Sequence, residues 1–246
     1  MRSELAKARV DRKRPLRDQI YELVRNLILT GKIGPGEIVD EKLIAAQLNV
    51  SRTPVREAVK KLSDEHLIDV IAQSGTRAAL IDRHEVEQAY LIRHALEMES
   101  AAQAAKNMNP AYAELLSDNL LAHARAIERK DYVLAIATDD QFHRTICEIS
   151  NLPRLWRAIE ISKAQLDRCR HMMLPRAGEA EATLEQHREI IRALNSRDAD
   201  KACRAMADHL QRAFGNAAKV LDSEFAKTSP QLSPQAKEPL LRRRGH

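Results

Sequence analysis

Apolar residues recur at helical spacing along the N-terminal third of the chain. Apolar positions every three or four residues predict a helix over 16–30, and Gly31 is a typical C-terminal stop. A short helix is expected over 41–48, and another from 51 to about 66. The tight turn at Asn49-Val50 separates these two, which is the spacing of a helix-turn-helix.

The pattern then changes twice. Two short apolar segments, 67–71 and 77–81, flank a turn that contains Gly75 and predict a two-stranded hairpin, a candidate wing. From residue 82 onward the pattern is helical again, with short breaks. Six helices are expected, over 84–106, 110–129, 132–150, 153–173, 179–195 and 199–221. The predicted fold class is therefore mainly α: an N-terminal winged helix-turn-helix followed by a C-terminal, all-α antiparallel helical bundle.

Composition adds a basic flexible arm and a tail to these two domains. The arm comprises residues 1–13, and the segment from Met1 to Arg17 carries a local net charge of +5. Such a segment can contact DNA phosphates, or it can be a solvated, disordered terminus. We expect the DNA-binding domain over 14–82 and the bundle over 83–222. The proline-containing segment 223–246 lacks periodicity and is expected to be disordered.

The overall composition limits the class of protein. A chain of 246 residues with 44% apolar residues and no apolar stretch of membrane-spanning length is expected to be a cytoplasmic globular protein. Its three separated cysteines indicate neither a disulfide framework nor a zinc ribbon. The net charge of +5 permits an anionic partner. With only 3% aromatic residues, double-stranded DNA fits better than single-stranded nucleic acid.

The segment from 51 to 62 has the character of a DNA-reading helix. Ser51 is a suitable N-cap, and Pro54 is tolerated in the first turn. Arg52, Arg56 and Lys60 recur every four residues on one face, opposite an apolar face. Arginine can bind guanine bidentately, although any one of these arginines can equally contact a phosphate or remain solvated.

Four polar residues fall on the inward faces of predicted bundle helices: Asp139, His143, His187 and His209. A single buried histidine is more often a hydrogen-bonded core residue. Three histidines and a carboxylate on facing helices can converge on one divalent cation, as in other bundle metal sites. Zinc is the first choice, and nickel, iron and manganese remain open. Cys147 lies one turn beyond His143, and an inert buried thiol is its simpler interpretation.

The N-terminal motifs resemble the GntR family of bacterial transcriptional regulators, in its FadR-type branch with an FCD ligand-sensing domain, over about 14–222. The segments that carry the resemblance are Leu16 to Ile20, Thr30-Gly31-Lys32, Pro35-Gly36-Glu37 and the run Val50 to Ala58. The resemblance implies operator contacts by Ser51, Arg52, Thr53 and Arg56, a basic contact by Lys42, and Gly75 at the wing tip. His66 stands where the family usually has glycine, and the wing sequence over 72–77 also departs from the family, so the resemblance is carried by the recognition helix and not by the wing.

The C-terminal part resembles the metal-binding FCD domains. That resemblance implies an Asp-His-His-His metal set formed by Asp139, His143, His187 and His209. It also places Arg93 in the effector pocket, where an arginine can clamp a carboxylate. The alternative for Arg93 is a surface salt bridge with Glu97, one helical turn away.

These observations predict a homodimeric transcription regulator, with repression as the expected sense. Its bundle would bind a divalent metal and a small organic acid, which modulates binding to double-stranded operator DNA. One alternative is a metal-dependent enzyme that acts on a small organic acid, with an accessory DNA-binding head and Glu148 or Glu185 as general base. A purely structural metal site is another. We expect no enzymatic activity.

Overall fold

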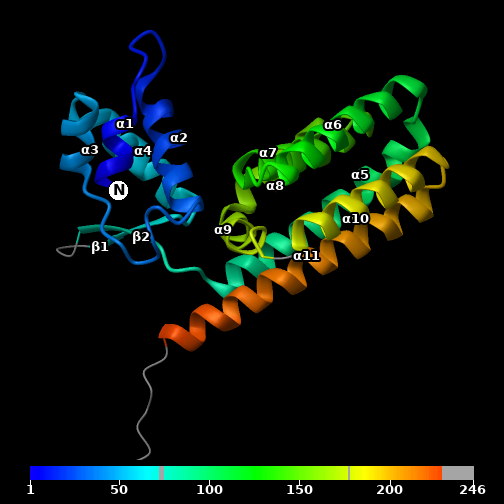
Figure 1. The fold of residues 1–246 in the computed structure, drawn as a ribbon. Helices are drawn as coiled ribbons and strands as arrows, with labels where there is room; N and C mark the ends of the chain where they lie inside the picture. Colours follow the sequence, from blue (N-terminus) through cyan, green and yellow to red (C-terminus); the bar gives the residue numbers. More distant parts are fainter. Residues whose placement is uncertain (72–74, 177, 229–246) are drawn as a thin grey trace, which may run out of the picture.

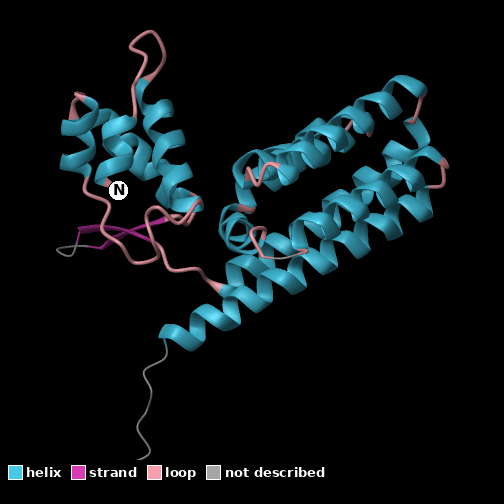
Figure 2. Cartoon of the chain, in the orientation of Figure 1, coloured by secondary structure: helices cyan, strands magenta, loops and turns pink. Residues whose placement is uncertain are grey.

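The computed structural model describes residues 1–71, 75–176 and 178–228, with side chains up to residue 222. It has two parts, a small N-terminal head of helices with a hairpin and a long helical bundle (Figures 1 and 2). Among the described residues, no helix is long and apolar enough to cross a membrane. Residues 72–74 of the expected wing and most of the expected tail lie outside the described residues.

The head has the predicted winged helix-turn-helix order. Its elements are α1 (Arg2–Lys7), α2 (Leu16–Leu29), α3 (Glu41–Leu48), α4 (Arg52–Asp64), β1 (Ile68–Ile71) and β2 (Gly75–Ala78). Asp40 caps α3 by accepting from the amides of Lys42 and Leu43, and Asn49 turns the chain into α4 with a φ of 51°. The strands pair antiparallel, with Ile68 opposite Ala78. The apolar faces of α2, α3 and α4 form one core.

The basic N-terminal arm is more ordered than the sequence predicted. Residues 2–7 form α1, which packs against α3. Leu5 is fully buried in the core of the head, and Glu4 pairs with Lys32 at 2.8 Å and with Lys7 at 3.3 Å. A flexible arm over 1–13 was therefore wrong for these residues, because one leucine and one carboxylate are enough to hold the short helix on the head.

The bundle contains seven helices among the described residues, where six were expected. They are α5 (Arg83–Asn107), α6 (Pro110–Glu128), α7 (Tyr132–Ile149), α8 (Pro153–Ser162), α9 (Ala164–Met173), α10 (Glu179–Asn195) and α11 (Ala199–Thr228). The expected helix over 153–173 breaks at Lys163, whose buried ammonium group lies 2.7 Å from Asp140 and 2.6 Å from Asp167. Helix α11 also continues beyond its expected end, into the segment expected to be a disordered tail.

Helix α9 joins the bundle to the head. Its first residue, Ala164, belongs to the core of the head, and α9 contacts α2. Arg168 donates a hydrogen bond to the carbonyl oxygen of Ala79 at 2.7 Å, and Gln165 donates to that of His66. Through these contacts α9, a helix of the bundle, is attached to the head as well.

Candidate metal centre and nucleic-acid interface

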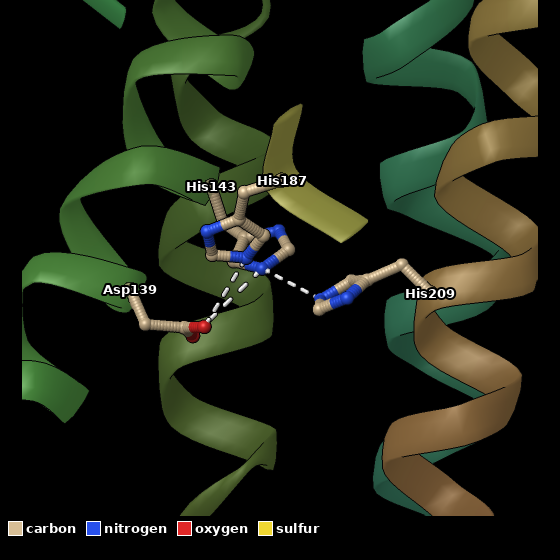
Figure 3. A group of neighbouring side chains, drawn as sticks. All are labelled: Asp139, His143, His187 and His209. Atoms are coloured by element: carbon tan, nitrogen blue, oxygen red, sulfur yellow. Dashed lines mark hydrogen bonds and ion pairs between the residues drawn. The ribbon is translucent and has the colours of Figure 1, made fainter. Parts of the chain in front are cut away.

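The structure brings the four predicted metal ligands together in the middle of the bundle. Asp139 and His143 lie one turn apart on α7, His187 comes from α10, and His209 comes from α11. One ligand atom from each residue lies within 4.8 Å of those from the other three, and all four side chains are buried. Figure 3 shows the three imidazole rings and the carboxylate pointing toward a common centre.

The outer nitrogens of two of the rings have polar partners, an ion-pair contact for His143 and a hydrogen-bond partner for His209. Nδ1 of His143 contacts the carboxylate of Glu97, and Nδ1 of His209 lies 2.9 Å from Oε1 of Gln186. Because both partners are acceptors, the protons belong on the Nδ1 atoms, and each Nε2 carries a free lone pair. These two Nε2 atoms face each other at 3.2 Å. Two facing lone pairs repel, and a shared cation relieves that repulsion, so the donor set fits a metal ion.

The protonation states also suit a metal. Burial lowers the pKa of His187 to about 4 and holds the pKa of His209 well below its usual range, so both imidazoles are neutral at pH 7. Burial alone would raise the pKa of Asp139, but Arg170 and His187 outweigh it and lower that pKa well below its usual range. The cluster therefore offers three imidazoles, of which at least those of His187 and His209 are neutral, and one carboxylate, a set that suits zinc and neighbouring transition metals.

Arg170 is a further charged group at the cluster. Its Nη2 atom contacts Oδ2 of Asp139, while Nη1 lies 2.8 Å from both Asp140 and Asp167. Burial opposes its charge, yet these three carboxylates raise the pKa of Arg170 well above its usual range. Asp139 is thus shared between the ligand cluster and a largely enclosed guanidinium group on α9.

A cavity of about 60 Å³ lies beside the cluster. Asp139 and His209 line it, together with the guanidinium-bearing residues Arg93 and Arg170. Arg93 is 3% exposed and donates from Nε to Glu97 at 2.6 Å. The sequence left two interpretations of Arg93, a pocket residue and a surface ion pair with Glu97. In the structure Arg93 lines the cavity and also forms the pair with Glu97, but this pair is buried and not on the surface.

Three residues of this site were not predicted. Glu97 was considered only as a partner of Arg93; the spacing of four put both residues on one face of α5, and the structure shows that this face is buried. His123 lines the cavity from α6, and its spacing of seven from the buried Leu116 was a signal in the sequence. No pattern in the sequence pointed to Arg170. Because both charged and apolar residues of α9 are buried, the sequence of this helix shows no distinct inward face. The proposed general bases of the enzyme alternative, Glu148 and Glu185, are exposed.

The predicted DNA-contacting residues lie on the surface of the head. The exposed side chains are those of Lys42, Ser51, Arg52, Thr53 and Arg56. Ser51 occupies the N-cap position of α4, but its side chain accepts no capping hydrogen bond from the described residues, so the capping role predicted for its hydroxyl was wrong. Among the described residues, the ion-pair contact of Arg56 is a long one of 3.7 Å with Glu41, which leaves its guanidinium largely in solvent. The cationic face of α4 is therefore available.

The strands of the hairpin are shorter than predicted, and the second lies earlier, over Gly75–Ala78 instead of 77–81, so that Gly75 belongs to the strand and not to the turn. Gly75 is exposed, has a φ of 89° and begins β2 directly after 72–74, so its place at the tip depends on residues outside the described part of the chain. His66, which replaces the usual glycine, has a φ of 56°. That left-handed conformation is the one in which glycine carries no steric penalty.

Comparisons with known proteins agree with this architecture. The family model described as "Bacterial regulatory proteins, gntR family" matches residues 16–77, and the FCD domain model matches residues 88–212. The HTH-type transcriptional repressor RspR of Escherichia coli is 37% identical over 197 residues, which are 80% of this chain and 86% of that protein. The probable D-xylose utilization operon transcriptional repressor of Paenarthrobacter nicotinovorans is 31% identical, over 78% of this chain and 84% of its own length.

Solved structures share the fold. The structure of E. coli McbR/YncC matches with a TM-score of 0.72 at 23% identity, and covers 84% of this chain and 98% of its own. A transcriptional regulator from Rhodococcus sp. RHA1 matches with a TM-score of 0.68 at 21% identity, over 82% and 97% of the two chains. The chain belongs to the GntR family of transcriptional regulators and carries an FCD domain. The family predicted from the sequence motifs is confirmed.

Proposed function

We propose that this regulator is a homodimeric repressor whose bundle binds a divalent metal and a small carboxylate effector, which together modulate operator binding. The observation that carries the proposal is the convergence of Asp139, His143, His187 and His209 beside a cavity lined by two arginines. A metal would be held by the three imidazoles and the carboxylate. When bound, it would supply a Lewis-acidic centre for an effector oxygen.

The arginines supply the chemistry for the effector. Arg93 and Arg170 both border the cavity, and a guanidinium group binds a carboxylate through two parallel hydrogen bonds. Both arginines already neutralise buried carboxylates, Glu97 and Asp139 respectively. The cavity volume of about 60 Å³ suits a small organic acid better than a large ligand.

The exposed cationic face of α4 supports DNA binding. We assign base and phosphate contacts in double-stranded operator DNA to Ser51, Arg52, Thr53 and Arg56, a basic contact to Lys42 on α3, and a wing contact near Gly75. In a helix-turn-helix the second helix enters the major groove with its N-terminal residues at the base edges. Two heads in a homodimer would read paired half-sites. The similarity to RspR, a repressor, favours repression.

Thermal unfolding with and without metal tests the proposed metal and effector sites. Zn²⁺ added to EDTA-treated protein should raise Tm, because a ligand at 100 times its Kd stabilises the native state by about 2.7 kcal/mol. His187→Ala should abolish this shift, while His84→Ala, at an exposed position on α5, should retain it. A panel of small organic acids should raise Tm further only with Zn²⁺ present. Equal Zn²⁺ shifts in both variants would refute the site.

The enzyme alternative predicts turnover. We expect no enzymatic activity, since the relatives are regulators and the carboxylates considered as bases, Glu148 and Glu185, are exposed. Glu185 also pairs with Arg188 and Arg192. Incubation of the Zn²⁺-loaded protein with each acid that raises Tm, followed by quantification of the acid, separates the two functions. Sustained loss of the acid at substoichiometric protein would favour the enzyme.

A further inference from the structure

A continuous series of ion pairs leads from the ligand cluster to the end of the recognition helix α4. It begins at Asp139, passes through Arg170 and Asp167 on α9 and Arg25 on α2, and ends at Glu65. Glu65 is the C-cap residue of α4. These five residues are called the ion-pair relay below.

The contacts of the relay are direct and poorly accessible to water. Nη1 of Arg170 lies 2.8 Å from Oδ1 of Asp167, whose Oδ2 lies 3.8 Å from Nη2 of Arg25. Nε of Arg25 lies 3.3 Å from Oε2 of Glu65. No side chain of the relay is more than 22% exposed. Charges in such surroundings are screened much less than charges on the surface, so a change at one end is felt by the next pair.

The helix that carries the middle of the relay is also fixed to the head. Arg168 and Gln165 donate to the backbone carbonyls of Ala79 and His66, on either side of the hairpin, and Ala164 packs in the core of the head. The same helix therefore touches Asp139 at one point and the DNA-binding domain at several others. Helix α9 is therefore the structural element that connects the ligand cluster to the head.

We propose that the ion-pair relay transmits metal occupancy to the C-terminal end of α4. This inference rests on the proposed metal site. A divalent cation bound by Asp139 places positive charge beside the Arg170 guanidinium, and like charges repel. Arg170 then relies more on Asp140 and Asp167. The 3.8 Å contact between Asp167 and Arg25, the longest in the relay, weakens first, and the link through Arg25 from the end of α4 to α9 loosens.

Amide hydrogen exchange of the full-length protein, measured in EDTA and in Zn²⁺, tests the relay. Zn²⁺ should slow exchange in peptides that contain residues 187 and 209, which reports binding. It should also speed exchange over 62–68, at the end of α4, by about twofold or more, because local opening follows the loss of tethering contacts. Operator DNA is not needed for this readout.

Two variants interrupt the relay from opposite sides. Asp167→Asn removes the central charge, and Arg25→Gln removes the link in the head while leaving every charge of the bundle in place. In both, Zn²⁺ should still slow exchange around 187 and 209 but leave 62–68 unchanged, and Arg25→Lys should restore part of the response. Glu160→Gln is the matched control, because Glu160 borders the same interdomain cleft as Arg25 but pairs with Arg144 at 3.0 Å. It should respond like the wild type.

Each outcome decides between distinct ideas. A wild-type response over 62–68 in Arg25→Gln overturns the relay, even if Asp167→Asn does not fold. Zn²⁺ protection in the bundle of the wild type, with no change or slower exchange over 62–68, also overturns it and leaves the metal site standing. An absence of protection around 187 and 209 refutes the proposed metal site, and the relay falls with it.

Discussion

Glu97 contacts the nitrogen of His143 that faces away from the ligand cluster. One carboxylate oxygen meets Nδ1 of His143, and the other accepts from Nε of Arg93 at 2.6 Å. Burial would raise the pKa of Glu97, but Arg93 and His143 outweigh it and lower that pKa below its usual range. A charged carboxylate thus fixes the His143 tautomer that presents Nε2 to the cluster, as outer partners of metal-bound histidines do.

Removal of Glu97 should weaken metal binding without removing a ligand. We expect Glu97→Ala to reduce Zn²⁺ affinity by about 10-fold to 100-fold, the range typical of such outer partners. Glu97→Gln should lose less, because its amide oxygen can still accept from Nδ1. Competition with a chromophoric chelator measures the affinity, and the Co²⁺ spectrum reports the ligand geometry. Glu99→Gln, at an exposed position on the same helix, is the control. Unchanged affinity in Glu97→Ala would exclude this role.

The convergence of the four side chains of the cluster was predictable because helical periodicity places each of them on an inward face. Asp139 and His143 share the inward face of one helix, and His187 and His209 interrupt otherwise apolar faces. The residues that contact these four side chains, such as Glu97, were harder to predict from the sequence. A spacing of four between Arg93 and Glu97 fits a surface pair as well as a buried one, and only packing decides.

Helix α9 shows where sequence reasoning fails. Its buried residues include Gln165, Asp167 and Arg168, since α9 is enclosed by the head as well as by the bundle. A helix enclosed on several sides by polar partners has no clear apolar face. No glycine or proline marks the break at Lys163, so the expected helix over 153–173 ran through it.

Arg52 should determine sequence preference more than affinity. Arg52→Ala is expected to lose about 1–3 kcal/mol of discrimination between a duplex selected from a random pool by the wild-type protein and a scrambled duplex. Affinity for the scrambled duplex should fall little, because other cations still contact the phosphates. Titrations at one fixed salt concentration measure both. Arg188→Ala, in the bundle, should match the wild type. Unchanged discrimination in Arg52→Ala would remove Arg52 from the base-reading set.

His171 should make stability fall in mild acid. Burial, followed by the Arg170 charge, lowers the pKa of His171 to about 4, against about 6.5 in the unfolded chain. The unfolded state therefore binds the proton more readily, and the stabilisation present above pH 6.5 is lost as the pH falls toward 4. After a discount for partial exposure, this loss is about 1 kcal/mol at pH 5.

Urea unfolding in EDTA at pH 7 and pH 5 measures the effect of His171. The difference in the free energy of unfolding between the two pH values should be smaller in His171→Gln than in the wild type. The exposed His84 provides the control, since His84→Gln should retain the full difference. An equal difference in all three proteins would show that His171 does not contribute.

Leu5 decides whether the first residues are part of the head. Its side chain is fully buried in the core that α2, α3 and α4 form, and α1 contacts α3. Leu5→Ala should cost about 2 kcal/mol, the low end for a buried leucine, because a terminal helix can detach before the domain unfolds. Urea unfolding followed by circular dichroism measures this loss, and Leu115→Ala, at a position 48% exposed, should change little. If both variants matched the wild type, residues 2–7 would be the flexible arm that their charge indicated.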